Sequence, residues 1–368
     1  MPRLSFACAL LTVLAASLVA QRASGARGGV RTLPVGALPV AIAVDAPTHR
    51  AFVLNQNGYS VSILDTQAAR VLRTVPLGSP DHLPQDLTLS ARTGLVFALN
   101  EGTDFDKPGT LSVLDAHDGH LRAVLPLGAN PSGGALDARR GHLFVTSGSA
   151  LSVLDARSGR LRRSAPSGAS PRDPTFAARA DRVFVANNDD NTVTTFDAST
   201  ARPLRTAPVG ESPGPMVVDE RAGHVFVCNL FGASLTMLDA ASGRPLRTIA
   251  LPANPNDIAL DPLDGRAVVP EQDAHSATIV DTRAGRVLRT IRVGKEPVAV
   301  AIDARAGRAF IANLAGNSVS VLDVRRGRVL REVPVGAGPS TLAIDPQGQR
   351  VIVASGASNS VSVFPESP

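Results

Sequence analysis

The sequence predicts an all-β fold: a β-propeller of eight four-stranded blades, closed by an outer strand from the N-terminal end of the domain. Three observations predict this fold. A block of about 42 residues recurs eight times in the 368-residue chain, each block holds four short segments rich in Val, Ile, Leu and Thr, and no long stretch has a helical period. Four short strands per period of about 40 residues are typical of a propeller blade. A ring of seven blades is the alternative at this stage.

The most regular segment of each block ends in aspartate. It reads Val-Ser-Ile-Leu-Asp at 61–65, and equivalent segments stand at 111–115, 151–155, 193–197, 235–239, 277–281, 319–323 and 361–364. The successive spacings are 50, 40, 42, 42, 42, 42 and 42 residues, so the second block carries an insertion, at 101–110. Segments this short and this rich in β-branched residues indicate strands.

Three further segments complete each block, and we letter the four strands A to D in chain order. Strand A follows a proline, strand B resembles Phe-Val-Ala-Asn at 184–187, strand C is the segment ending in Asp, and strand D resembles Val-Leu-Arg-Thr-Val at 71–75. The aligned prolines are Pro39, Pro84, Pro131, Pro171, Pro213, Pro255, Pro297 and Pro339. A D-like segment at 30–36 precedes the first strand A, and the chain stops after a strand C. The first segment is therefore expected to complete the last blade, which removes two exposed sheet edges.

These units resemble the YVTN-type β-propeller repeat family. The resemblance rests on the Asp-ended strand, the glycine turn, the aligned proline and the Phe-Val-x-Asn strand, in which Phe or Val stands where that family has Tyr. It extends over residues 30–364. The resemblance implies the propeller fold and says little about function, because the motif residues are turn and core residues.

The first 26 residues are expected to be a secretory signal peptide. An arginine at position 3 is followed by an apolar run at 4–20 without Asp or Glu, and small residues follow. This is the pattern of an export signal. We therefore expect one propeller domain at 27–368, exported to the periplasm or the exterior, with no transmembrane segment after signal removal. Cys228 would be the only thiol of the mature chain, so no internal disulfide is expected.

Repetition separates structural residues from candidate functional ones. The Asp residues that end strands A and C precede tight glycine turns, where a carboxylate accepts backbone N–H bonds. The A–B and C–D turns must share one side of the disc, which we call the turn face, and most of the Arg residues lie there. The B–C and D–A loops share the other side, which we call the loop face. These loops vary from block to block, and repeat proteins carry function where the copies differ.

The loop face is predicted to be acidic. Against Lys107, Arg172 and Lys295 it holds thirteen acids: Asp81, Asp86, Glu101, Asp104, Asp106, Asp173, Asp189, Asp190, Glu211, Asp257, Glu271, Asp273 and Glu296. Such a surface favours cations or basic partners. The alternative is that these acids only keep the loops soluble.

Six residues are the candidate ligand-binding site. Asp86, Asp173 and Asp257 each stand two residues after the aligned proline, where the inner strand begins at the mouth of the central channel. Glu101 opens the long insertion of the second block. Glu271 and His275 belong to a segment that departs from the usual Asn loop. Carboxylates that converge here would suit Ca²⁺, but the sequence alone gives no reason to assign a cofactor or a metal site.

The sequence favours a non-catalytic binding or scaffold module that uses the acidic loop face. We expect a monomer whose partner is a protein, a peptide or a cationic ligand. The net charge of +5 falls to +3 without the first 26 residues, so nucleic acid is not an expected partner. Aromatic residues are only 4% and Trp is absent, which argues against sugar-stacking or base-stacking sites. No catalytic residues are assigned; the alternative is a metal-dependent hydrolase of the lactonase type, which also occurs on propellers.

Overall fold

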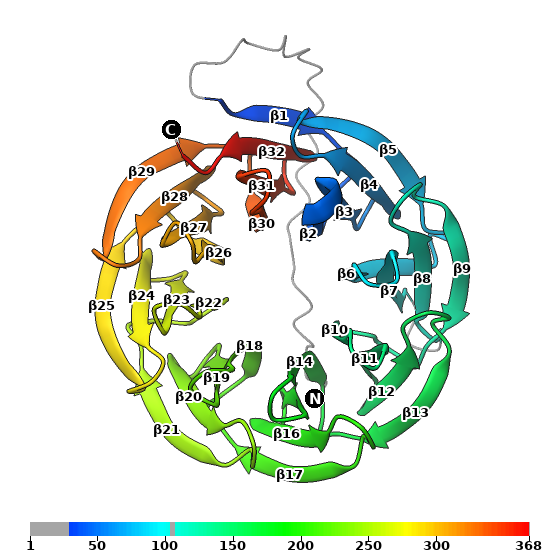
Figure 1. Cartoon of the computed structure of the whole chain (residues 1–368), viewed down its shortest axis with the longest axis horizontal. Helices are drawn as coiled ribbons and strands as arrows, with labels where there is room; N and C mark the ends of the chain where they lie inside the picture. Colours follow the sequence, from blue (N-terminus) through cyan, green and yellow to red (C-terminus); the bar gives the residue numbers. More distant parts are fainter. Residues whose placement is uncertain (1–28, 104–106, 368) are drawn as a thin grey trace, which may run out of the picture.

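The computed structural model describes residues 29–103 and 107–367, and it is a closed ring of eight blades (Figure 1). Each blade is a four-stranded antiparallel sheet. The eight-bladed prediction is confirmed, and the seven-bladed alternative is wrong. The signal-peptide prediction falls on residues outside the described part of the chain. Within residues 29–103 and 107–367, no helix has the length and hydrophobicity needed to cross a bilayer.

Strands A and B form the inner half of each blade. The A strands, which line the centre of the ring, are β2 (Pro39–Asp45), β6 (His82–Ser90), β10 (Gly133–Asp137), β14 (Pro171–Ala177), β18 (Pro213–Asp219), β22 (Ala259–Asp261), β26 (Pro297–Asp303) and β30 (Pro339–Asp345). The B strands are β3 (Arg50–Asn55), β7 (Leu95–Gly102), β11 (His142–Ser147), β15 (Arg182–Asn187), β19 (His224–Asn229), β23 (Arg266–Glu271), β27 (Arg308–Asn313) and β31 (Arg350–Ser355).

Strands C and D form the outer half. The C strands are β4 (Ser60–Asp65), β8 (Thr110–Asp115), β12 (Ala150–Asp155), β16 (Thr192–Asp197), β20 (Ser234–Asp239), β24 (Ser276–Asp281), β28 (Ser318–Asp323) and β32 (Ser360–Pro365). The D strands of blades 1 to 7 are β5 (Arg70–Pro76), β9 (Leu121–Pro126), β13 (Leu161–Pro166), β17 (Pro203–Pro208), β21 (Pro245–Ala250), β25 (Arg286–Arg292) and β29 (Arg328–Pro334).

The ring closes as the sequence predicts. Blade 8 takes its outer strand from the other end of the domain, because β1 (Arg31–Pro34) pairs antiparallel with β32. Leu33 lies opposite Val361, and Arg31 donates to the carbonyl of Ala68 in blade 1. The two ends of the ring are therefore held by one short strand, and neither is left as an open sheet edge.

The hydrophobic core lies between neighbouring blades. Strands B and C are buried almost completely, and their alternating side chains pack against the next blade on each side. One cluster, for example, joins Phe52 and Leu54 of blade 1 to Val96 and Ala98 of blade 2. The few aromatic residues of the chain contribute to this core. Seven of the eight blades bury a phenylalanine that is less than 2% exposed, and blade 6 is the exception.

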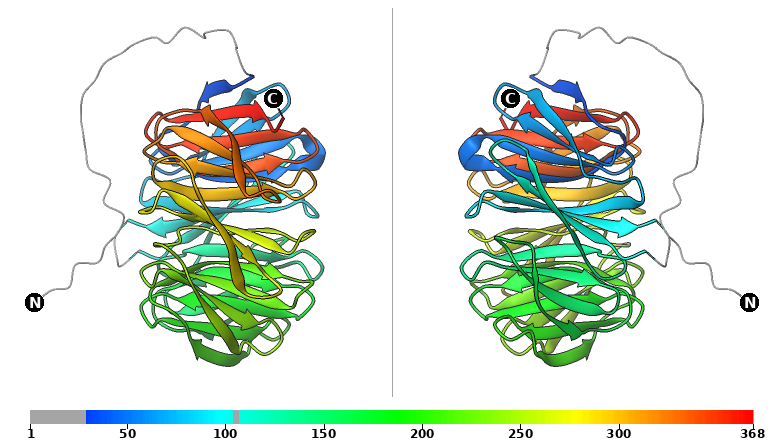
Figure 2. Two further views of the ribbon diagram at one scale, coloured as in Figure 1. Left: turned by 90° about the vertical axis from the view of Figure 1, so that its left-hand side faces the viewer. Right: turned by 90° about the vertical axis from the view of Figure 1, so that its right-hand side faces the viewer.

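The turn face repeats the same contacts around the ring. In every blade the residue after the last residue of strand C donates its backbone N–H to the A–B turn, as Thr66 does to the carbonyl of His49. Asp65 caps its own C–D turn by accepting from the N–H groups of Gln67 and Ala68 at 3.0 and 2.8 Å. The three-residue 3₁₀ helix η1 (Ala46–Thr48) forms the A–B turn of blade 1, and the edge-on views of Figure 2 show it in blue on one flat face of the disc. The structural role predicted for the repeated Asp residues is confirmed.

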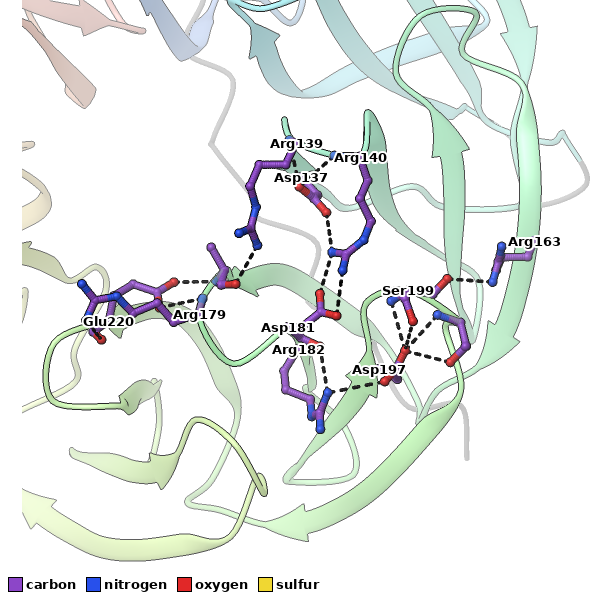
Figure 3. A network of polar contacts seen from close by, with 12 residues as sticks. Asp137, Arg139, Arg140, Arg163, Arg179, Asp181, Arg182, Asp197, Ser199 and Glu220 are labelled. Carbon is purple, nitrogen blue, oxygen red and sulfur yellow. Dashed lines mark hydrogen bonds and ion pairs between the residues drawn. The ribbon is translucent and has the colours of Figure 1, made fainter.

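Arginines of strand D link successive blades on this face. Each one donates to backbone carbonyls that follow strand C of the next blade or end it, as Arg289 does to the carbonyls of Arg326 and Gly327 at 3.1 and 3.0 Å. The equivalent donors are Arg31, Arg73, Arg163, Arg205, Arg247 and Arg331, while blade 2 has Ala123 in this position. Figure 3 shows a second kind of link, in which Arg140 of the A–B turn of blade 3 forms ion pairs with Asp137 of the same turn and with Asp181 of blade 4. The arginine content of the turn face thus serves the joints between blades.

Candidate ligand-binding face

The loop face is built from B–C loops that lean on the neighbouring connections. In blade 1 the N–H of Gln56 donates to the carbonyl of Leu38 in the D–A connection, and the N–H of Leu77 donates to the carbonyl of Tyr59. A buried asparagine supports each regular loop from beneath. Asn55, for example, donates to the hydroxyls of Ser60 and Ser62 at 3.1 and 2.9 Å. The loops are therefore fixed platforms that present different side chains at equivalent places.

Asp86 and Asp257 stand at the inner edge of blades 2 and 6, at the loop-face end of the inner strands, which we call the channel mouth. Strand A is an edge strand, so some of its backbone N–H groups have no partner in their own sheet. Asp86 Oδ2 accepts the N–H of Gly134 from blade 3 at 2.9 Å. Asp257 Oδ2 accepts the N–H of Val300 from blade 7 at 2.9 Å, and its Oδ1 accepts the N–H of Ile258 at 2.8 Å. Each carboxylate therefore fastens its own blade to the next one.

Asp173 occupies the same position in blade 4 but is held differently. The residue after it is Pro174, which has no N–H to offer. Its backbone has a φ of 49°, in the left-handed region, whereas Asp86 and Asp257 are not among the residues with positive φ. Within the described residues, no hydrogen bond is made to its carboxylate. Asp173 is thus the one member of the three whose oxygens are left open to a ligand.

All three carboxyl groups hold protons more tightly than usual. Desolvation is the main cause in each case, and it raises the pKa of Asp173 and of Asp257 to about 6. The positive charge of Arg172 acts against this rise at Asp173, while the negative charges of Asp86 and Asp257 add to it. The pKa of Asp86 is also raised by burial, against backbone hydrogen bonds from Leu87 and Gly134. Because Asp173 responds to both other carboxylates, the three share one electrostatic environment.

Glu101 lies on a hairpin that extends blade 2 beyond the other blades. The insertion lengthens β6 and β7, so that Leu83 pairs with Glu101 and His82 with Gly102. Glu101 Oε2 accepts the side-chain amide of Gln85 at 2.6 Å, which places it beside the residue that precedes Asp86. At the far end of this extension, Lys107 and Asp81 form an ion pair of 3.2 Å. Glu101 therefore belongs to the same sector of the loop face as Asp86.

Glu271 replaces the supporting asparagine of blade 6. It is fully buried and accepts the hydroxyl of Ser276, just as Asn55 contacts Ser60. Its other oxygen, Oε1, is buried without a hydrogen-bond partner within the described residues. In blade 5 the N–H of Gly210 donates to the supporting Asn229, but the equivalent residue in blade 6 is Pro252, which has no N–H. Burial accordingly raises the pKa of Glu271, and the side chain lies under the loop, not on its surface.

His275 lies in the B–C loop above Glu271. Its backbone has a φ of 50°, and its Nδ1 accepts the N–H of Glu296 from the next connection at 3.1 Å. An imidazole that accepts at Nδ1 is neutral and carries its proton on Nε2. Blade 6 thus brings together Asp257, Glu271 and His275 within one loop system. The backbone of Glu271 forms an isolated antiparallel β-bridge with Pro255. The structure does not place these three residues in contact with Glu101 of blade 2.

The described residues hold no group of three or more His, Cys, Asp or Glu side chains arranged to bind a metal ion. Of the thirteen acids assigned to the loop face, Asp104 and Asp106 lie outside the described residues. Several others bind loop backbone or side chains: Asp190 accepts the N–H of Ala169, and Asp189 accepts the hydroxyl of Ser170. The predicted acidity of the loop face thus comes from two kinds of carboxylate: those that accept hydrogen bonds within the loops, and those, such as Asp173, that accept none from the described residues.

Sequence reasoning missed an apolar feature on this face. Phe231 is 69% exposed, the highest value among the large hydrophobic residues of the described chain. It follows Leu230 in the B–C loop of blade 5, where the equivalent pairs in blades 1 and 4 are Gln56-Asn57 and Asn188-Asp189. The alignment of the repeats contains this signal, because an aromatic residue stands where other copies have polar ones.

The comparisons with known proteins agree on the fold. No protein-family model and no curated protein matches this sequence, so the resemblance to YVTN-type repeats stays a prediction. The structure resembles the computationally designed Ika8 protein, with a TM-score of 0.74 and 14% identity over 91% of this chain and 98% of that one. It also resembles BamB from Moraxella catarrhalis, with a TM-score of 0.66 and 16% identity over 92% and 99% of the two chains. At such low identity these likenesses support a propeller scaffold and nothing more specific.

Proposed function

We propose that this protein is an exported, non-catalytic propeller that binds a basic protein or peptide through its loop face. The carboxylate of Asp173 carries the proposal: it lies at the channel mouth, near two other carboxylates, and accepts no hydrogen bond from the described residues. A lysine or arginine of a partner would supply the donors it lacks. The other two carboxylates would contribute to the negative potential while they hold neighbouring blades together.

The contrast with the turn face supports this assignment. Most turn-face contacts recur from blade to blade, and arginines there donate to backbone carbonyls of the next blade. The loop face has a common framework, but its exposed residues differ between blades. A rigid ring with unlike loops on one side suits recognition without chemistry. No contact in the described structure favours the hydrolase alternative.

The test is the binding of a short Lys-rich peptide, followed by fluorescence anisotropy at rising salt. We expect saturable binding that weakens as salt is added, because screening reduces attraction between exposed charges. Asp173→Asn should weaken the binding. The matched control, Asp264→Asn, removes one carboxylate that pairs with Arg325 on the turn face and should leave binding unchanged. Binding that ignores salt, or that responds equally to both variants, would contradict the proposal.

A calcium titration addresses the ion that the sequence suggested. Chelated protein is melted with and without added Ca²⁺, since a tight native-state site raises the melting temperature. Under the proposal of a peptide-binding face, added Ca²⁺ leaves the melting temperature unchanged. A clear rise that Asp86→Asn and Asp257→Asn abolish would instead assign the channel mouth to the cation.

A further inference from the structure

The B–C loop of blade 5 places an apolar pair, the half-buried Leu230 and the exposed Phe231, beside the open carboxylate of blade 4. A methyl group at Gly214 would lie 2.5 Å from Leu230 Cδ1 and 3.6 Å from Asp173 Oδ2, so both side chains border the space next to this glycine. The inner strand β18 has Gly214 and Pro215 at this point, which leaves that space free of a side chain from Gly214. Leu230 and Asp173 are thus neighbours across the junction between blades 4 and 5.

Phe231 extends this apolar surface outward. Its N–H donates to the carbonyl of Glu211 at 3.3 Å, which fixes the loop, while its ring remains 69% exposed. The side chain of Glu211 is itself exposed. A large aromatic residue that is held on a fixed backbone and left mostly uncovered is typical of an anchor in a protein interface.

The hydrogen bonds of equivalent loops show what blade 5 has lost. In blade 4, Asn188 donates to the hydroxyl of Ser212 and the carbonyl of Pro213 in the next blade at 2.8 and 2.9 Å. In blade 1, Gln56 donates to the carbonyl of Pro84 at 3.1 Å. Leu230 stands in that position in blade 5 and cannot donate at all. The loop of blade 5 therefore lacks this contact between blades, as the loop of blade 7 does with Leu314, and only in blade 5 is this leucine followed by an exposed phenylalanine.

We propose that the junction of blades 4 and 5 is the specificity site of the loop face, and that it takes a peptide segment in which an apolar or aromatic side chain adjoins a lysine or arginine. This inference rests on the proposed function and narrows it to one class of partner. The apolar side chain would lie on Leu230 and Phe231, and the basic one would reach Asp173. The complementarity of charge argues for a basic segment, because the Asp173 carboxylate and Leu230 border the same space and the exposed Glu211 is joined to Phe231 through its backbone carbonyl.

The test uses two synthetic peptides of equal length and charge, one of Lys, Gly and Ser and one in which two Ser residues are replaced by Phe. We expect the Phe-containing peptide to bind about tenfold more tightly, and Phe231→Asn to abolish that advantage without affecting the other peptide. The substitution copies the residue that blade 1 has at this position, Asn57, so folding should be retained. Ala315→Asn, at the equivalent place in blade 7, is the matched control and should change neither affinity.

The outcomes separate this inference from the broader proposal. If both peptides bind equally and Phe231→Asn has no effect, the specificity site is wrong, whereas the acidic loop face remains supported. If neither peptide binds, the proposed function fails and this inference fails with it. If Ala315→Asn removes the advantage as well, the apolar contribution does not come from blade 5 and the inference is overturned. A second variant, Leu230→Gln, copies Gln56 of blade 1 and should reduce the advantage in the same way.

Discussion

The turn face and the loop face are made from the same eight repeats, yet they use their charged side chains in different ways. On the turn face, Asp residues cap turns and Arg residues donate to the next blade, as Asp65 and Arg289 do. On the loop face, equivalent positions hold unlike residues, and Asp173 is left without a hydrogen bond from the described residues. The comparison teaches that a charge repeated in most blades is structural, and that a charge or an exposed ring found in one blade is the better functional candidate.

The junction between blades 7 and 8 carries a pair of acidic residues on the turn face. At two other junctions a threonine donates to the Asp that ends strand A of the preceding blade: Thr66 to Asp345 and Thr282 to Asp219, both at 2.5 Å. Blade 8 has Glu366 in place of the threonine, facing Asp303. A carboxyl group can replace a hydroxyl donor only while it is protonated.

The largest predicted effect follows from this pair. Burial, reinforced by the hydrogen bond and the negative charge of Asp303 and the charge of Asp345, raises the pKa of Glu366 to about 8, against the opposing charge of Arg308. The unfolded chain releases this proton near pH 4.5, so the contribution of Glu366 is present in full below that pH and is lost as pH rises toward 8. Glu366→Gln should therefore increase the free energy of unfolding at pH 8 by about 3 kcal/mol and have little effect at pH 5.

Urea denaturation of both proteins from pH 5 to pH 8 measures the difference. Glu366→Thr, which installs the donor of blades 1 and 6, serves as the second variant and should flatten the pH dependence in the same way. An identical pH dependence in all three proteins would show that Glu366 is ionised in the fold.

The second prediction tests whether the turn-face arginines hold the blades together. Arg289→Ala removes the hydrogen bonds to the carbonyls of Arg326 and Gly327 and should lower the free energy of unfolding by about 1–2 kcal/mol. Thermal melting and urea titration report the change. Arg292→Ala, at the exposed end of the same strand, is the control and should have an effect near zero. Equal losses in the two variants would mean that the linking contacts add nothing beyond the packing of the side-chain stem.

The third prediction concerns the carboxylate beneath the loop of blade 6. Burial raises the pKa of Glu271, so ionising this carboxyl is less favourable in the folded chain than in the unfolded one. The free energy of unfolding is therefore lowered near neutral pH. Glu271→Asn restores the residue of blades 1, 2, 4, 5 and 7 and should raise stability at pH 7.5 by about 1 kcal/mol. The gain should disappear near pH 4, since Glu271 is then protonated in both states. Loss of peptide binding in this variant would instead give Glu271 a role in the ligand site.

The fold could be predicted from the sequence almost completely. The repeat spacing, the aligned prolines and the leading D segment determine eight blades and their closure by β1. The candidate site could be predicted only in part. The position of Asp86, Asp173 and Asp257 follows from their register after the proline, but their different hydrogen bonds depend on the next residue and on the neighbouring blade. Glu271 was expected at the loop surface, and it lies beneath the loop because it replaces a supporting asparagine.

Two features could not be predicted from the sequence: the contact between Glu366 and Asp303 on the turn face, and the exposure of Phe231 on the loop face. Glu366 follows the last strand C, and its partner Asp303 is 63 residues earlier in the sequence. A contact between residues of neighbouring blades depends on how the blades pack, and no local sequence pattern predicts it. Phe231 was visible as a departure from the repeat, but only its exposure distinguishes an interface anchor from a buried aromatic residue.

The smallest predicted effect is the pH dependence of peptide binding, and it distinguishes the two faces directly. Burial raises the pKa of Asp173 and Asp257 to about 6, so both carboxylates lose negative charge as pH falls from 7.5 to 5. Affinity for the Lys-rich peptide should fall about threefold over that range, because the peptide keeps its charge while the channel mouth is neutralised. Anisotropy titrations of Asp173→Asn should show weaker binding and a smaller dependence on pH.

The acids of the turn face have lower pKa values. At Asp155, for example, the hydrogen bond from Arg162 keeps the pKa far below its ordinary value. A peptide bound there would therefore keep its affinity down to pH 5, and that result would move the binding site off the loop face.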